Sequence, residues 1–278
     1  MRAGVVSRTD AEKALETTKQ IIAYLESKGV EVVVETDTAL ALELEDHNTN
    51  LQDLDGDFVV TVGGDGTILR AAMEMRTAHT PLFGVNMGRR GFLSEVPPEG
   101  IEAAIQRVLD GDYVIEESLK VKSWGIGLTD VFPDALNEVL IASSLPSKML
   151  LMRLSIEGEF ITDIQADGAI ISSPTGSTAY NMSAGGAIVA PTVEALSLTV
   201  ICPYSYFRSL VFPASSTVRI ELLKPQTDGI AIIDGRSYIA LKPGSVVEAT
   251  MSENVTRFIR FKPFYSRIQK RLMHLQTS

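Results

Sequence analysis

The run Gly63-Gly-Asp-Gly-Thr67 is the part of this sequence whose residue types best fit phosphate chemistry. It follows an apolar, β-type run from Phe58 to Val62 and precedes a helix-like pattern. Glycines let a backbone approach a phosphate closely, and a helix with Thr67 as its N-cap would direct free N–H groups at the anion. Asp65 would stand at the carboxyl end of a strand, where open α/β sheets bind ligands. We expect the phosphate to be held by Gly63, Gly64, Gly66 and Thr67, with Asp65 beside it.

A plainer interpretation of the same run is a tight strand-to-helix turn in which Asp65 only caps the helix. The chain has no Gly-x-x-x-x-Gly-Lys-Ser/Thr loop, so it offers no P-loop lysine to neutralise phosphates. If the run binds a phosphorylated ligand, backbone amides and a metal ion must hold the phosphates.

Two later segments carry the donors and acceptors of a polar binding site. Asn137 and Glu138 place an amide beside a carboxylate, and this pair can donate to and accept from neighbouring hydroxyls. The segment from Ala166 to Pro191 contains small hydroxyl residues that donate without bulk, and its Tyr180 offers a flat face to a ring. The hydroxyl residues are Thr175, Ser177, Thr178 and Ser183. Each has a plainer alternative. Asn137 and Glu138 could be ordinary polar residues at the surface, and the segment could be a turn of small residues packed on a sheet.

These segments together resemble the NAD kinase family. Gly63 to Thr67 matches a signature that NAD kinases share with diacylglycerol and sphingosine kinases, and phosphofructokinases carry a related turn. The resemblance runs from about Val59 to Gly235. The blocks similar to NAD kinases in particular are Gly84 to Glu95, Leu136 to Val139, Ala166 to Pro191, Ile201 to Ser205 with Arg208 to Pro213, and Ile233 to Arg236.

The resemblance implies transfer of a phosphoryl group from ATP or polyphosphate, with Mg²⁺ or Mn²⁺, to the adenosine-ribose 2'-hydroxyl of NAD. Asp65 would act on that hydroxyl as a base or an orienting group, Asn137 and Glu138 would present the ribose, and Arg70 would face phosphate. Asp167 and Tyr180 would contact the bases. The NAD-binding residues implied are Asp65, Gly66, Arg70, Asn137, Glu138, Lys148, Asp167, Thr175, Thr178, Ala179, Tyr180, Asn181, Met182 and Ser183; no metal ligand is assigned.

The sequence departs from the family pattern at three positions. Tyr204 stands where relatives often have His, Arg236 where Gln is usual, and Gln165 where a basic residue is common. These departures concern individual contacts and leave the class unchanged. Donor preference, tolerance of NADH and the choice between base and orienting group for Asp65 stay open.

The elements that must position these residues fall into two regions with different sequence patterns. Residues 1–112 alternate β-branched runs with helical patterns, which predicts an α/β domain with a parallel sheet. The resemblance implies a domain like that of phosphofructokinases and diacylglycerol kinases. Residues 113–256 hold many short β-type runs, which predict a β-rich domain. The resemblance implies that this domain binds NAD. Residues 257–278 are expected to be a basic tail that returns to the first domain. The strands expected are Arg2 to Ser7, Val30 to Val34, Phe58 to Val62, Pro81 to Val85, Ile115 to Val121, Met152 to Ile156, Ala169 to Ser172, Leu198 to Ile201, Val218 to Leu222 and Ile230 to Ile233.

Capping residues predict where the first and last helices of the first domain begin and end. Thr9 and Glu12 have capping-box spacing before the first helix, and Gly29 is expected to end it. The last helix of the first domain is expected over Gly100 to Leu109.

The composition limits which partners and which cellular compartment we expect. With 25 basic and 35 acidic residues the net charge is -10, which argues against nucleic acid. The longest apolar run, Gly185 to Pro203, contains Pro191 and Glu194, which argues against a membrane span. The single cysteine, Cys202, is expected to be buried, and with no signal peptide we expect a cytoplasmic protein. The resemblance, and apolar residues in Gly185 to Phe212, predict a homodimer or homotetramer.

Two other functions compete with NAD phosphorylation. A different small-molecule kinase of the same superfold, acting on a lipid or a sugar phosphate, would use Gly63 to Thr67 but would leave Thr175 to Tyr180 unexplained. A non-catalytic NAD(P)-sensing module would keep Tyr180 and Asn137 but would not need Asp65.

Overall fold

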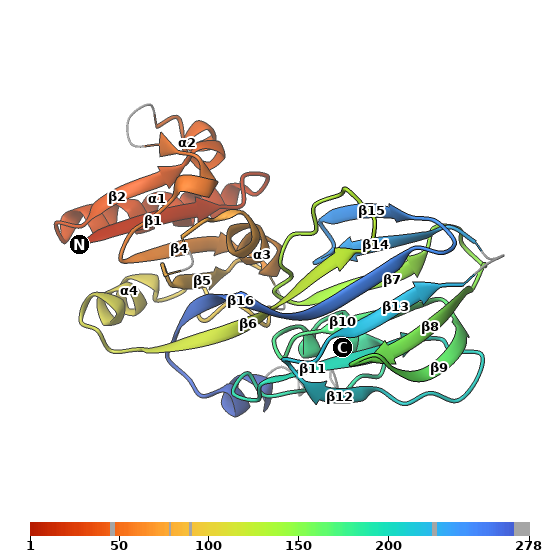
Figure 1. The fold of residues 1–278 in the computed structure, drawn as a ribbon. Helices are drawn as coiled ribbons and strands as arrows, with labels where there is room; N and C mark the ends of the chain where they lie inside the picture. Colours follow the sequence, from red (N-terminus) through yellow and green to blue (C-terminus); the bar gives the residue numbers. More distant parts are fainter. Residues whose placement is uncertain (45–47, 78, 89–90, 224–226, 270–278) are drawn as a thin grey trace. The chain divides into compact units, whose positions relative to one another are not determined.

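The structure is a computed structural model that describes residues 1–44, 48–77, 79–88, 91–223 and 227–269. The chain divides into two compact units (Figure 1). Unit 1 contains residues 1–117 and the described residues from Thr256 onward, and unit 2 contains Ser118–Val255. The expected class, an α/β domain with a parallel sheet and a β-rich domain, is confirmed.

Unit 1 is built on a parallel sheet in the order β3-β2-β1-β4-β5, and the end of β16 continues it beside β5. The strands are β1 (Arg2–Ser7), β2 (Glu31–Glu35), β3 (Asn48–Thr49), β4 (Phe58–Gly63), β5 (Leu82–Asn86) and β16 (Val246–Arg260). The helices are α1 (Glu12–Ser27), α2 (Thr36–Leu42), α3 (Asp65–Glu74) and α4 (Ile101–Leu109), with a short 3-10 turn, η1 (Leu51–Asp53). The four strands predicted in this region are therefore confirmed to within one residue at each end.

Alternating side chains divide the helices between the two faces of this sheet. Val60 and Val62 of β4 and Phe83 of β5 pack with α1 and α4 in one apolar core. On the other face, Gly84 of β5 leaves space for Ile68 of α3, whose Cδ1 would lie 2.8 Å from an added Cβ. The sheet is thus buried on both sides, which explains the nearly unbroken apolar runs of its strands.

The structure corrects three expectations in unit 1. Helix α1 begins after Ala11 without a side-chain cap, so Thr9 and Glu12 form no capping box. Helix α3 begins after Gly64 rather than after Thr67, because the chain turns into the helix as soon as β4 ends. The stretch expected as a tail begins as a strand, since β16 extends to Arg260, and residues 264–269 are helical. Gly29 ends α1 as predicted, with a φ of 74°.

Unit 2 contains an antiparallel sheet in the order β12-β11-β10-β7-β14-β15. Its strands are β7 (Glu138–Ser143), β10 (Gly168–Ser172), β11 (Ala195–Ile201), β12 (Leu210–Pro213), β14 (Gly229–Ile233) and β15 (Ser237–Leu241). The first half of β16 pairs with β13, which is followed by β8 and β9, while β6 also pairs with β16. These strands are β6 (Val114–Gly125), β8 (Leu150–Ile156), β9 (Glu159–Ala166) and β13 (Val218–Leu222).

Short helical turns, η2 (Gly176–Thr178) and α5 (Tyr180–Ser183), follow β10. Cys202, at the end of β11, is exposed with a φ of 46°, so the expectation that it is buried is wrong. Among the described residues, no helix has the length and apolarity needed to cross a membrane.

Candidate functional site: two anchored turns

The glycine turn of unit 1 stands at the carboxyl end of β4, as predicted. Gly63 must be a glycine, because an added Cβ would lie 2.2 Å from Oγ1 of Thr67. Gly64 and Gly66 instead have nothing within 4 Å of an added Cβ, so their side of the turn is open. An open backbone at the N-terminal end of the ten-residue helix α3 suits a phosphate, whose charge the helix dipole favours.

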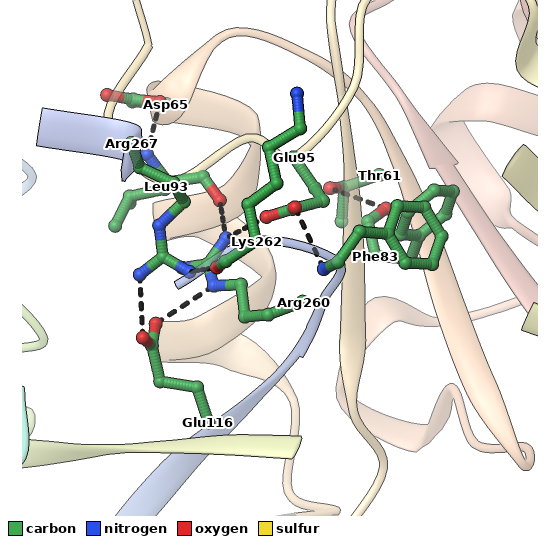
Figure 2. A network of polar contacts seen from close by, with 10 residues as sticks. Thr61, Asp65, Phe83, Leu93, Glu95, Glu116, Arg260, Lys262 and Arg267 are labelled. Carbon is green, nitrogen blue, oxygen red and sulfur yellow. Dashed lines mark hydrogen bonds and ion pairs between the residues drawn. The ribbon is translucent and has the colours of Figure 1, made fainter. Parts of the chain in front are cut away.

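The Asp65 carboxylate is held by the loop that follows β5. Its Oδ2 accepts the backbone N–H of Phe92 at 2.7 Å. Its Oδ1 accepts that of Leu93 at 3.1 Å (Figure 2). Gly91 permits this approach, since an added Cβ would lie 2.9 Å from Oδ1. Asp65 is half-buried and each of its oxygens can accept a further hydrogen bond. Arg89 and Arg90 of the same loop lie outside the described residues.

Arg70, expected to face phosphate, is engaged elsewhere in unit 1. Its Nη1 lies 2.9 Å from the buried Glu35 and 3.5 Å from Asp37. Glu35 also accepts the backbone N–H of Thr38 at 2.9 Å, so the ion pair joins α3 to the start of α2. Burial opposes ionisation of Glu35, but Arg70 and Thr38 together lower its pKa. The Arg70 charge is therefore already largely compensated by this pair.

In unit 2 the turn that carries Asn137 and Glu138 is fastened by one buried carboxylate. Asp234 accepts the backbone N–H groups of Leu136 at 2.7 Å, Asn137 at 2.8 Å and Glu138 at 2.9 Å. Asp234 itself has a φ of 47° in the turn after β14. Because β14 pairs with β7, this aspartate fixes the backbone just before β7 begins.

Glu138 has an unusual electrostatic environment. Burial raises its pKa to about 8, the negative Asp234 adds to the rise, and the backbone N–H of Tyr180 opposes it. Its Oε2 is buried without a hydrogen-bond partner in the described part of the chain. Burial raises the pKa of Asp234 too, but the three N–H donors and Lys120 favour its charge. With a pKa of about 8, Glu138 favours its protonated form at neutral pH.

The segment after β10 packs directly on the Asn137 turn. Ser173 donates to the carbonyl of Leu136 and also accepts the N–H of Gly176 at 3.0 Å. Gly176 must be a glycine, since an added Cβ would lie 2.0 Å from the Asn137 carbonyl oxygen. With the Tyr180 N–H on Glu138, the structure brings the amide-carboxylate pair and the hydroxyl-rich segment into one place.

Part of this segment has buried side chains that bond within the unit. Asn181 is completely buried, and its side chain accepts from Thr199 at 2.7 Å and donates to the Ala187 carbonyl at 3.2 Å. Ser177 is also buried and uses its hydroxyl on neighbouring backbone. Thr178 is buried as well, and its hydroxyl donates to the Thr175 carbonyl. These three side chains shape the segment from within.

The remaining expected contacts are accessible, but not all lie together. Tyr180 is 43% exposed, Ser183 is exposed, and Thr175, Ala179 and Met182 are half-buried. Asp167 and Lys148 are exposed at the other end of β7, since Gly168 pairs with Ala142 while Ser172 pairs with Glu138. The two ends of β7 are separated by five residues of strand, which corresponds to a distance of roughly 17 Å.

The three departures from the family pattern are accessible positions of unit 2. Gln165 of β9 and Tyr204 are joined, since the Tyr204 N–H donates to the Gln165 carbonyl at 2.8 Å, and both side chains are exposed. Arg236 is exposed in the turn between β14 and β15.

The described residues contain no group of three or more His, Cys, Asp or Glu side chains placed to hold a metal ion. The donors present do not therefore form a protein cage for Mg²⁺. This ion commonly binds through one or two carboxylates together with substrate phosphates, and in that mode Asp65 is the carboxylate nearest the open glycine turn.

Sequence reasoning missed two anchoring residues. Asp234 lies in the block Ile233 to Arg236, which resembles NAD kinases, but the resemblance alone assigns it no role. An Asp-Gly pair after a β-type run is nevertheless a signal for a turn. Arg260 was assigned to a tail, although it interrupts the apolar alternation of Phe258, Ile259 and Phe261. A charge within a core-like strand pattern is a signal for a buried ion pair.

Comparison with known families matches both units. The model for the ATP-NAD kinase N-terminal domain matches residues 3–113, and the model for the ATP-NAD kinase C-terminal domain matches residues 136–261. The NAD kinase of Methanothermobacter thermautotrophicus is 37% identical over 276 residues, covering 98% of this chain and 96% of that protein. The NAD kinase of Methanosphaera stadtmanae is 38% identical over 278 residues, covering 98% and 99%.

Solved structures agree with these relatives. Yeast NADH kinase in complex with NADH aligns with a TM-score of 0.87 at 26% identity, covering 100% of this chain and 89% of that one. An NAD kinase from Archaeoglobus fulgidus in complex with ATP aligns with a TM-score of 0.79 at 29% identity, covering 98% and 99%. With a glycine turn around an anchored aspartate in unit 1 and an Asn-Glu turn beside a hydroxyl-rich segment in unit 2, the chain belongs to the ATP-NAD kinase family.

Proposed function

We propose that this chain transfers the terminal phosphoryl group of ATP to the adenosine-ribose 2'-hydroxyl of NAD and so makes NADP. The observation that carries the proposal is the Asp65 carboxylate, held by two backbone N–H groups beside the open backbone of Gly64 and Gly66. Phosphorylation of a lipid or a sugar would also use this turn, but it would not need the pair Asn137 and Glu138 beside Tyr180.

Asp65 accepts a hydrogen bond from the 2'-hydroxyl and directs its oxygen at the donor phosphorus. As the new O–P bond forms, the bond from phosphorus to the bridging oxygen of ADP breaks, and the hydroxyl proton leaves toward Asp65. The transition state of phosphoryl transfer is loose and spreads its charge over the phosphoryl oxygens, so positioning supplies most of the acceleration. A carboxylate whose two oxygens are fixed by backbone amides is well suited to that task.

Asn137 and Glu138 hold the ribose in this proposal. Protonated Glu138 can donate as well as accept, and the Asn137 side chain can do both, so the two can serve adjacent hydroxyls. Tyr180 packs its exposed ring against a base, and Thr175, Ala179, Met182 and Ser183 line the approach. We include Lys148 and Asp167 as contacts to a more distant part of the dinucleotide. A divalent cation, Mg²⁺ or Mn²⁺, enters with the phosphates of ATP and neutralises their charge.

The test is a comparison of acceptors. The purified chain is incubated with Mg²⁺ and ATP and with NAD, diacylglycerol or fructose 6-phosphate, and the phosphorylated product is identified by mass spectrometry. We expect phosphate only on NAD, at the 2'-position. Phosphorylation of the lipid or the sugar would establish the rival kinase, and NAD binding without transfer would establish the sensing module. Polyphosphate in place of ATP, and NADH in place of NAD, test the two remaining choices.

Assembly into a homodimer or homotetramer is also part of the proposal, as is a cytoplasmic location. Leu196, Leu198 and Phe212 of the apolar stretch are buried within one chain, but Tyr204 and Tyr206 are 82% and 83% exposed. Ile188, Val193 and Val211 add exposed apolar surface, and such surface favours association. A neighbouring copy could also bring its own Asp167 or Lys148 to a dinucleotide. Sedimentation at micromolar concentration tests this, and a fully active monomer would refute it.

A further inference from the structure

A buried arginine lies behind the loop that holds Asp65. Arg260, at the end of β16, is 3% exposed, and its Nη1 donates to the Leu93 carbonyl at 2.6 Å (Figure 2). The same Leu93 residue donates its N–H to Asp65 at 3.1 Å. Leu93 is therefore held by its two backbone groups, with the arginine on its carbonyl and the aspartate on its N–H.

The guanidinium is fixed by acidic partners from two other segments. Its Nε donates to Glu116 at 2.9 Å, and its Nη1 lies 3.5 Å from Glu95, which is 1% exposed. Glu95 also accepts the backbone N–H of Phe261 at 2.9 Å. The guanidinium carbon lies 4.5 Å from the centre of the Phe258 ring, so stacking adds to the ion pairs. Arg260 thus has one orientation, which fixes the position of the Leu93 carbonyl.

Arg267 secures the far side of the network. Its Nη2 donates to Glu116 at 2.6 Å, and its Nη1 donates to the Lys262 carbonyl at 3.3 Å. Burial opposes the charge of Glu116, yet Arg260 and Arg267 together lower its pKa, so the carboxylate stays ionised. The chain after β16 is in this way tied to the strand β6 and to the loop after β5.

From these contacts we propose that Arg260 is a positioning residue for phosphoryl transfer, which fixes the Asp65 carboxylate through the Leu93 backbone. The inference rests on the proposed role of Asp65. A planar guanidinium is required, because its Nε and Nη1 serve Glu116 and the Leu93 carbonyl at the same time, and an ammonium group cannot reproduce that fork. Loss of Arg260 leaves Asp65 chemically intact but its loop free to shift, and a displacement of about 1 Å can cost 10²-fold in rate.

The first experiment measures kcat and KM for Arg260→Met, Arg260→Lys and the matched control Arg257→Met. Arg257 lies three residues earlier on the same strand, but its guanidinium pairs with the partly exposed Glu117 and lies 3.4 Å from the ring of His79. We expect kcat to fall roughly 10- to 100-fold for Arg260→Met and less for Arg260→Lys, with KM for NAD within about threefold. The control should keep kcat within about twofold, as is usual for a surface ion pair.

A double-mutant cycle with Asp65→Asn separates positioning from general stability. If Arg260 acts through Asp65, its replacement should lower kcat by less than about twofold once Asp65 is already Asn. A residue with only a structural role would lower kcat by the same factor in both backgrounds. The cycle is run with Arg260→Lys as well, because Arg260→Met leaves Glu95 and Glu116 buried without their partner and could fail to fold.

The outcomes distinguish this inference from the function on which it rests. Wild-type kcat in both Arg260 variants, or equal factors in both backgrounds, would overturn the positioning role while leaving Asp65→Asn defective. Wild-type turnover in Asp65→Asn alone would overturn the proposed role of Asp65, whereas the comparison of acceptors tests the proposed function itself. If Arg260→Met does not fold, the cycle with Arg260→Lys decides between the same two results.

Discussion

Asp234 accepts the backbone N–H of Asn137 at 2.8 Å across 97 residues of sequence. This carboxylate receives two more backbone N–H groups from the same turn, so one side chain sets the backbone that presents the expected ribose contacts. Asp65 uses the same device in unit 1, where it receives two N–H groups from the loop after β5. In both units, a carboxylate side chain accepts hydrogen bonds from backbone N–H groups that lie in a turn and not in a helix or strand.

The first prediction concerns this anchor. Asp234→Asn keeps the size of the side chain but turns an amide NH₂ toward backbone donors, so at least one buried N–H loses its acceptor, at about 1–3 kcal/mol. We expect a lower free energy of unfolding and a raised KM for NAD, measured by urea denaturation and steady-state kinetics. Asp163→Asn, at a surface ion pair with Arg153, is the matched control and should change neither. An unchanged KM in the Asp234 variant would show that the turn holds its shape without the carboxylate.

The second prediction concerns pH and Glu138. Its pKa is raised from 4.5 to about 8 on folding, so between these values the folded chain holds a proton that the unfolded chain has released. The stabilisation is complete below pH 4.5, falls as pH rises, and is lost above pH 8. Each unit of separation corresponds to about 1.4 kcal/mol, so the whole effect is on the order of a few kcal/mol.

Urea denaturation at pH 5.5 and pH 8.5 measures this effect, with Glu138→Gln as the comparison. Glutamine resembles the neutral acid and cannot titrate, so the variant should lose less stability over this range than the wild type. Equal losses in the two proteins would mean that Glu138 titrates normally in the fold.

The third prediction concerns metal. The proposed function includes a divalent cation that binds with the phosphates of ATP, because the chain has no P-loop lysine to neutralise their charge. Activity should disappear with excess chelator and return with Mg²⁺ or Mn²⁺. We also expect the chelator to leave the melting temperature without nucleotide unchanged, because the cation is proposed to enter with ATP. Full activity in excess chelator would contradict this prediction.

The sequence was sufficient for local features of the fold. β1, β4 and β5 are short, largely apolar runs buried on both faces, and such runs are recognisable without knowledge of their partners. Thr67 was misplaced as a cap because a glycine can begin a helix wherever the strand ends, and no side-chain signal marks that point. Helix ends are for this reason the least predictable part of unit 1.

Features that depend on distant partners were not predictable. Ser177 and Asn181 were expected to face a ligand, but a short polar side chain can equally serve the backbone of its own loop, and only the fold decides which. The roles of Asp234 and Arg260 arise from contacts 97 and 167 residues away in the chain, which no local pattern encodes.

The central claim is that Asp65 acts on the acceptor hydroxyl, and turnover of Asp65→Asn tests it most directly. Asparagine loses one of the two backbone contacts, so NAD affinity and melting temperature are measured in the same preparation to confirm that the protein is folded and binds. We predict that kcat falls by about 10²-fold or more, the range for one positioned acid-base group, while the Kd for NAD changes little. A variant that binds NAD and turns over near the wild-type rate would contradict the account.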